Sequence, residues 1–205
     1  MTSNNYPQDI SQDRGRPEPV LFLSLAADAF TTYHQAHGEY PKEWFQLDFT
    51  FVNGPYHMDE PDIRASKADG NRWKPLKCEY TYEIKFSGRD TFHIQAINPR
   101  NSLSCQIRNG MDEPVININE ENIFHEYYRP VLRAVIDELK KNREDPSEFY
   151  ASVESQGPNQ AVVHLWHQDA FKAENLGIVG NPGGRCRDFY YDMKQKKITK
   201  KLGWQ

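Results

Sequence analysis

Cysteine is scarce in this chain, and negative charge outweighs positive charge. Three cysteines stand far apart among the 205 residues, and their odd number and wide spacing exclude a disulfide framework and a zinc knuckle. They are Cys78, Cys105 and Cys186. We therefore expect reduced thiols in a cytoplasmic protein. Asp and Glu number 29 against 25 Lys and Arg, so the basic surface of a nucleic-acid-binding protein is not expected.

Long apolar runs are also missing. The longest, residues 20–29, is interrupted by Ser24 and Asp28 and is far shorter than the roughly 20 residues that a membrane helix needs. Residues 1–18 are polar, show no apolar signal segment, and are predicted to form a disordered arm. One basic run alternates with apolar residues, which is typical of a solvated strand face. It comprises Lys194, Lys196, Lys197, Lys200 and Lys201. The sequence thus predicts neither a membrane nor a nucleic acid as a partner.

The first half of the chain carries two clear periodicities. Apolar residues recur at helical spacing over residues 19–37, and Gly38 is placed to end that helix. Residues 78–86 alternate between apolar and polar, which predicts a strand with one buried face, and two further alternating segments complete a three-stranded meander. The residues expected on the buried face are Tyr80, Tyr82, Ile84 and Phe86. Helix and meander together predict an α+β module over residues 19–112.

The second half predicts another helix and four more strands. Residues 122–142 have helical periodicity, and Pro130 inside them either kinks the helix or begins a second one. Strands are expected near 149–153 and 162–167, and the last two form a closing hairpin. These elements predict a second α+β module over residues 113–205. The predicted fold class is therefore α+β, in two modules that each pack a helix on an antiparallel sheet.

Chemistry-bearing residues gather at one place, near residue 167. His164, His167 and Asp169 are residue types that ligate metals or carry acid–base catalysis. Two histidines three positions apart on a strand face opposite sides, however, so a shared metal would need a bend. The Gly-rich residues 180–184 precede a strand rather than a helix, which is not the geometry of a phosphate loop. We therefore predict no catalytic residue, no cofactor and no metal.

The segment from His167 to Arg185 is instead predicted to face a protein partner. It is long, rich in glycine and set between two strands, which is where binding residues commonly lie on a rigid scaffold. Aromatic and arginine side chains are the usual energetic anchors of an interface. The predicted partner-binding residues are Trp166, Asp169, Phe171, Glu174, Arg185 and Arg187. The alternative is that Trp166 and Phe171 plug the open end of the sheet.

Residues 20–110 resemble the globular part of type IV pilins and pseudopilins. The resemblance rests on segments in a characteristic order, which are Ala26-Ala27 with Tyr33, Gly38-Glu39-Tyr40-Pro41, Trp73-Lys74-Pro75, Tyr80–Ile84 and Phe92–Ala96. Pilins polymerise through a long apolar N-terminal helix, and a polar arm stands in its place here. The resemblance therefore implies the fold of that family but not filament assembly.

Residues 122–205 resemble the small NTF2-like (cystatin-like) immunity proteins of bacterial toxin systems. The segments that carry this resemblance are Gly183-Gly184, Phe189–Asp192 and Lys196–Ile198. It implies a cytoplasmic immunity protein, or antitoxin, that binds and neutralises a cognate bacterial toxin. Two alternatives stay open: a pilin-like subunit or adaptor without its membrane helix, and an NTF2-like enzyme that uses His164, His167 and Asp169. The oligomeric state is not predicted.

Overall fold

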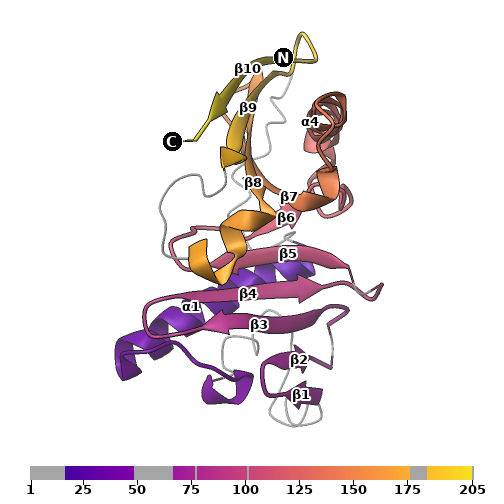
Figure 1. Cartoon of the computed structure of the whole chain (residues 1–205). Helices are drawn as coiled ribbons and strands as arrows, with labels where there is room; N and C mark the ends of the chain where they lie inside the picture. The colour runs from indigo at the N-terminus through magenta and orange to yellow at the C-terminus, as the bar shows by residue number, and fades with distance from the viewer. Residues whose placement is uncertain (1–16, 49–66, 77, 101, 176–183, 205) are drawn as a thin grey trace.

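A computed structural model describes residues 17–48, 67–76, 78–100, 102–175 and 184–204. Most of the predicted arm and of the Gly-rich segment lies outside these residues. The described strands form one antiparallel sheet of ten strands, which neighbour one another in sequence order (Figure 1). The strands are β1 (Lys67–Asp69), β2 (Arg72–Lys74), β3 (Thr81–Ser87), β4 (Phe92–Ile97), β5 (Leu103–Arg108), β6 (Val115–Asn117), β7 (Phe149–Ser155), β8 (Gln160–His167), β9 (Arg187–Asp192) and β10 (Lys197–Gly203).

Helix α1 (Glu18–His37) packs on β4 and β5 through a face that buries Phe22, Leu23, Ala26 and Phe30. Phe22 stacks on Tyr82 with ring centroids 3.6 Å apart, and Trp73 closes the cluster edge-on at 5.5 Å. Gly38 ends the helix at a φ of 75°, a left-handed conformation that glycine adopts without a Cβ clash, so the predicted stop is confirmed. The helix begins at Glu18, so this residue belongs to the body rather than to the predicted arm.

The predicted three-stranded meander is present as β3, β4 and β5. Tyr82 and Ile84 are buried at 0% and 3% exposure, as expected, and Ile84 lies opposite Ile94. The register shifts between Ile84 and Phe86, so Phe86 is only half-buried instead of joining the buried face. A short hairpin precedes the meander: β1 pairs with β2, and β2 continues the sheet from β3.

The second helix is shorter than its periodicity predicts. Helix α4 spans Arg129–Lys141, and Pro130 stands in its first turn, where a fixed φ and a missing N–H are tolerated. Residues 126–128 before it form a separate 3₁₀ turn. Of the two alternatives for Pro130, a new helix beginning at this proline is therefore confirmed, and a kink within one long helix is not. The buried face of α4 packs towards β8 and β10. It consists of Val131, Leu132, Val135, Ile136 and Leu139.

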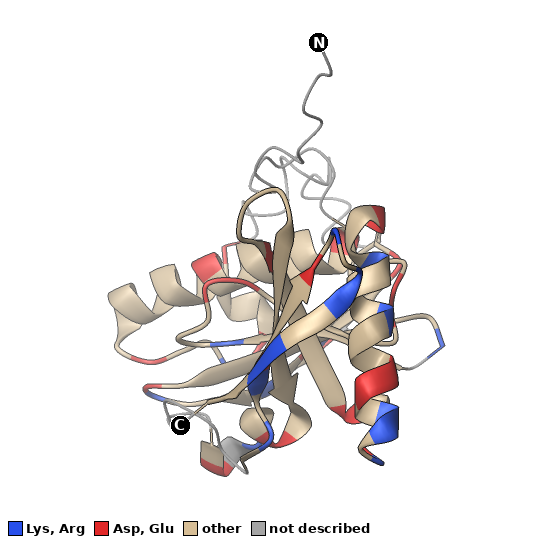
Figure 2. Cartoon of the chain, turned by 90° about the horizontal axis from the view of Figure 1, so that it is seen from above, with Lys and Arg blue, Asp and Glu red and all other residues tan. Residues whose placement is uncertain are grey.

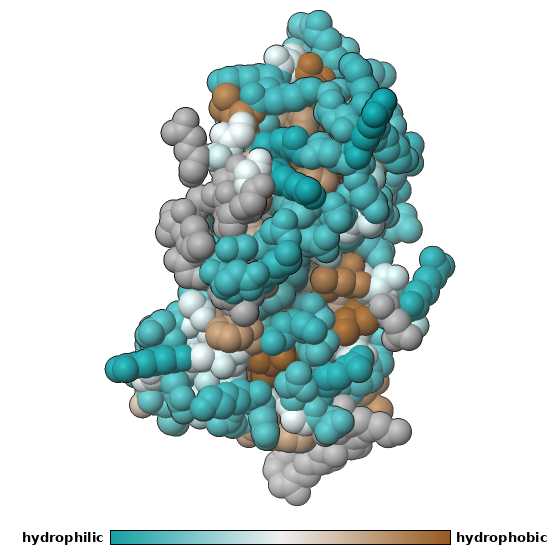
Figure 3. Space-filling model, viewed as in Figure 1, coloured by the Kyte–Doolittle hydropathy of each residue, from teal (hydrophilic) through white to brown (hydrophobic). Residues whose placement is uncertain are grey.

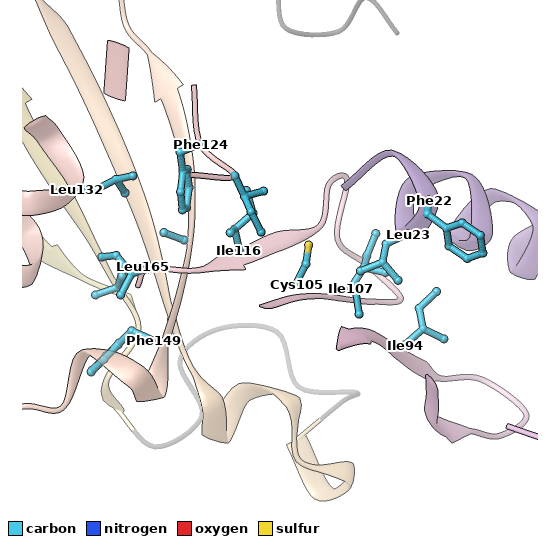
Figure 4. Packing of buried hydrophobic residues seen from close by; sticks show 14 of the residues in the cluster. Phe22, Leu23, Ile94, Cys105, Ile107, Ile116, Phe124, Leu132, Phe149 and Leu165 are labelled. Carbon is cyan, nitrogen blue, oxygen red and sulfur yellow. The ribbon is translucent and has the colours of Figure 1, made fainter. Parts of the chain in front are cut away.

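Strand β6 joins the two halves of the sheet. Ile116 pairs with Cys105 of β5 on one side and with Ala151 of β7 on the other. One continuous apolar cluster follows the same path, from α1 through β5 and β6 to α4 and β8. Figure 4 shows Phe22 at one end of this path and Phe149 at the other. The α+β class is thus confirmed, and the strands of both predicted modules share a single sheet.

The last strand explains the basic run. Strand β10 pairs only with β9, and it lies at the open edge of the sheet next to the C-terminus (Figure 2). Lys197, Lys200 and Lys201 are exposed on it, as a solvated strand face predicts. Lysines on an edge strand discourage pairing with another chain. The face seen in Figure 3 is mainly hydrophilic, with small apolar patches. Neither described helix is long and apolar enough to cross a membrane.

Candidate functional site

Three of the residues predicted to face a partner, Asp169, Glu174 and Arg185, lie around the end of β8. Arg185 reaches Glu148 at 3.3 Å and the Nε2 atom of His167 at 2.9 Å. Asp169 binds Lys172 at 2.6 Å, and this contact holds the pKa of the carboxyl below its usual range. Glu174 is exposed beside them in a 3₁₀ turn. The charged side chains of this cluster are thus largely paired with one another.

His167 lies at the centre of that cluster but is inaccessible. Its side chain is 2% exposed and lies between Asp169, 3.0 Å from Nδ1, and Glu148, 3.3 Å from Nε2. His164, three positions earlier, points to the other face of β8, as the strand geometry predicts. Among the described residues, no group of His, Cys, Asp or Glu is arranged to hold a metal ion.

Two of the predicted contact residues support the fold. Phe171 is 6% exposed and packs in a small apolar cluster with Tyr150 and Cys186, so a partner would not touch its ring. Arg187 forms an ion pair with Glu144, and its guanidinium lies 5.4 Å from the ring of Phe149. Burial is also the main reason why the pKa of the Cys186 thiol is raised, which makes it a poor nucleophile.

A pocket of about 390 Å³ opens on the face of the sheet that carries His164 and Trp166. Side chains alternate along a strand, so this face lies opposite the one where Val163 and Leu165 join the main core. Residues of the turn after β5 also line the pocket. The pocket is lined by Gly110, Met111, Asp112, Glu113, Val115, Ser152, Val153, Glu154, His164, Trp166 and Trp204.

Hydrogen bonds fix one wall of this pocket. Asp188 of β9 accepts from Nδ1 of His164 at 2.8 Å and from the indole N–H of Trp204 at 2.7 Å. Nε2 of His164 lies 3.4 Å from Glu154. The rings of Trp204 and Trp166 meet edge to face with centroids 4.4 Å apart. Imidazole and both indoles are therefore held in place before any ligand arrives.

Ser152, His164 and Asp188 stand side by side across β7, β8 and β9. A serine nucleophile needs its hydroxyl hydrogen-bonded to the histidine that the carboxylate orients. Here Nε2 of His164 lies near Glu154, and no hydrogen bond joins Ser152 to His164 among the described contacts. The wall is arranged to present carboxylate and aromatic groups rather than an activated hydroxyl.

Only part of this pocket could be found from the sequence. The period of two places His164 and Trp166 on one strand face, and Trp166 is among the predicted contact residues. Asp112 and Glu113 follow β5, and Trp204 follows β10, so only the strand order brings them to the same place. Glu154 and Asp188 likewise come from the neighbouring strands β7 and β9.

Comparison with known proteins gives no match: no family model matches the chain, and no curated protein or solved structure shows significant similarity. The resemblances to pilins and to NTF2-like immunity proteins therefore stay predictions made from sequence segments.

Proposed function

We propose that this chain is a cytoplasmic immunity protein that binds a basic bacterial toxin and neutralises it. The observation that carries the proposal is the chemistry of the pocket beside Trp166. Asp112, Glu113 and Glu154 line it, and of the described residues neither a lysine nor an arginine does. A surface of this sign attracts a positively charged partner and speeds the encounter.

The aromatic rings support binding to a protein rather than to a metal ion. Trp166 and Trp204 are half-buried and held by their neighbours, so they offer a contact that costs little conformational entropy on binding. Tryptophan is strongly enriched among the residues that contribute most to protein–protein binding. The cytoplasmic location is supported by the three cysteines, which are all free and buried.

We further propose that residues 19–112 and 113–205 are two modules, one pilin-like and one NTF2-like, joined through β6. The arrangement of α1 on β4 and β5, and of α4 towards β8 and β10, supports this division. The pocket lies where the two meet, since Asp112 and Glu113 follow β5 and the other lining residues include His164 and Trp166 of β8. A partner seated there would contact both modules.

The test uses the purified chain and the product of the neighbouring gene in its genome. We expect the two proteins to form a complex whose association rate falls steeply as salt is raised, because exposed charges are screened over about 10 Å at 0.1 M salt. The association rate is measured by surface plasmon resonance at 50 and 300 mM NaCl. A neighbouring protein that does not bind, or that binds equally fast at both concentrations, contradicts the proposal.

A further inference from the structure

The outer edge of β10 presents unpaired backbone groups. The N–H of Trp204 donates to the carbonyl of Cys186 at 3.1 Å, and Gly203 lies opposite Arg187 in the ladder. Backbone groups in an antiparallel pair point alternately towards the neighbouring strand and away from it. Those of Gly203, and of Lys201 two residues earlier, therefore point away from β9. No other described strand pairs with that side of β10, which ends the sheet (Figure 1).

The edge is open to a second backbone at Gly203. A Cβ atom added at this position would meet no atom within 4 Å. One reason for a glycine inside a strand is the close approach of another backbone. Further back, the register shifts between Ile198 and Lys200, and an irregularity of this kind bends a strand and ends regular pairing. The stretch that can pair with a further strand is therefore Lys200–Gly203.

The side chains of this stretch carry positive charge. Lys200 and Lys201 are exposed, and residues 197–203 include no Asp or Glu. The turn before β10 adds two more lysines, although the chain as a whole has a net charge of −4. Lys201 forms an ion pair with Glu138 of α4, which shows that a carboxylate can reach it. Leu202 is 39% exposed and adds one apolar side chain to the row.

This charge decides which strand fits the edge. Pairing with β10 of a second copy would bring the lysines of both strands together, and like charges on neighbouring strands are destabilising. Opposite charges across a strand pair are stabilising. The complementary occupant is therefore a strand that carries carboxylates.

We propose that β10 receives an extended acidic segment of a partner protein as an additional antiparallel strand. The backbone of the segment bonds to the outward groups of Lys201 and Gly203. Its carboxylates face Lys200 and Lys201, and an apolar residue lies opposite Leu202. The proposal goes beyond the immunity function and does not depend on it, because residues 197–203 do not line the pocket beside Trp166.

The probe is the peptide acetyl-Thr-Thr-Val-Glu-Glu-Thr-amide, which in antiparallel pairing can place its valine opposite Leu202 and its glutamates opposite the two lysines. Its counterpart has lysine at both glutamate positions. We expect the glutamate peptide at saturation to slow hydrogen exchange of the Lys201 and Gly203 amides several-fold, because both gain a hydrogen bond. NMR measures the exchange. No slowing with the glutamate peptide, or equal slowing with both peptides, overturns the proposal.

A pair of variants at one position tests the backbone contact. Gly203→Pro removes an outward N–H without removing a hydrogen bond to β9, and an edge strand tolerates such a proline. It should weaken binding of the glutamate peptide about fivefold or more, the effect of one lost hydrogen bond. Gly203→Ala keeps the N–H and should bind like the wild type. Unchanged amide signals in β8 show that each variant is folded. Equal affinity of the two variants overturns the proposal.

The contribution of charge is tested separately. Lys200→Gln with Lys201→Gln should weaken binding of the glutamate peptide about fivefold, through the loss of two cross-strand ion pairs. The control is Lys42→Gln with Lys85→Gln, which removes the same charge from exposed positions in the first half of the chain. Equal affinity of the two double variants overturns the proposal.

An oligonucleotide distinguishes a strand site from a surface for any polyanion. Octathymidylate carries negative charge but cannot form a strand, so it should leave the exchange of the Lys201 and Gly203 amides unchanged. Slowing by octathymidylate equal to that by the glutamate peptide would make β10 a nucleic-acid surface and overturn the proposal. None of these results bears on binding of the toxin, so the two proposals fail or stand separately.

Discussion

Partly buried polar side chains are the residues about which periodicity says least. Glu18 accepts hydrogen bonds from the backbone N–H groups of Glu79 and Tyr80, at 2.8 and 3.1 Å, and from the hydroxyl of Tyr82 at 3.0 Å. These contacts tie the start of α1 to the start of β3. A carboxylate at a helix start is also favoured by the helix dipole. In the sequence, Glu18 is one more polar residue of a polar segment, so its role could not be predicted.

His93 should make the stability of the protein pH-dependent. Burial is the main cause of its pKa of about 4, well below the usual 6.5, with Lys85 and Arg108 acting in the same direction. Between these values the unfolded chain binds the proton and the folded chain does not. The free energy of unfolding is therefore not reduced by His93 above pH 6.5, and it decreases as the pH falls from 6.5 towards 4. We expect His93 to lower the free energy of unfolding by about 2 kcal/mol when the pH is lowered from 7 to 5.

Urea unfolding at the two pH values measures this loss. The His93→Gln variant should lose about 2 kcal/mol less than the wild type on going from pH 7 to pH 5, whatever its stability at pH 7. His37→Gln is the control, because His37 is exposed on α1 and the variant should keep the full loss. If His93→Gln keeps the wild-type pH dependence, His93 is not the buried neutral imidazole described.

The burial of Ile84 reports the register of the meander. Ile84→Ala should lower the free energy of unfolding by about 2–5 kcal/mol, through lost transfer energy and a cavity beside Ile94. Lys85→Ala, at the exposed neighbouring position, should stay within about 0.5 kcal/mol of the wild type. Denaturant unfolding compares the two. A small loss of stability for Ile84→Ala and a large one for Lys85→Ala would show that the register of the strand differs by one residue from the one described.

At the scale of elements, long periodic segments were predictable and short ones were not. Residues 19–37 and 78–86 are long enough for the spacing of their apolar residues to identify α1 and β3, because only a helix and a strand, respectively, bring those residues to one face. The three-residue strands β1 and β2 carry too few alternations to be seen. The shift after Ile84 is a local irregularity that pairing with β4 reveals. Pro130 left two alternatives, which the sequence of α4 alone could not separate.

Strand β6 should be indispensable to both halves of the sheet. Ile116→Pro removes a backbone donor in a strand paired on both sides, and we expect a loss of about 3 kcal/mol or more. Lys197→Pro, at the first residue of the edge strand β10, should cost much less. Thermal unfolding followed by circular dichroism makes the comparison. Equal effects of the two prolines would mean that β6 does not hold the sheet together.

For the whole molecule, fold class was within reach of the sequence, but only part of the candidate site was. Each half shows its own helix and strands, so α+β follows from pattern alone. The strands join into one sheet through β6, where Ile116 pairs with Cys105 of β5 on one side and with Ala151 of β7 on the other. The pocket needs that joining as well, because its walls come from the turn after β5 and from β7 and β8. The segment His167–Arg185 was predicted instead, and its described charges are largely paired with one another.

A shared core should make the two halves unfold together. The apolar cluster runs without interruption from α1 to α4, so neither half buries its side chains alone. We expect one urea transition, with coincident curves from tryptophan fluorescence and far-ultraviolet circular dichroism. Hydrogen exchange should show similar protection for β4 and β8, a largely buried strand from each half. Two separate transitions would show that the modules are independent in stability.

Neutralisation of a toxin in living cells is the decisive test of whether this chain is an immunity protein. The measurement is the growth of bacteria that produce the product of the neighbouring gene, alone, with the wild-type chain, or with the Glu113→Lys/Glu154→Lys variant. We expect that the product alone stops growth and that the wild-type chain restores it. The charge-reversed variant should remain folded but fail to restore growth, because like charges then meet at the contact. Growth arrest that the wild-type chain does not relieve, or a neighbouring product without toxicity, would contradict a role in immunity.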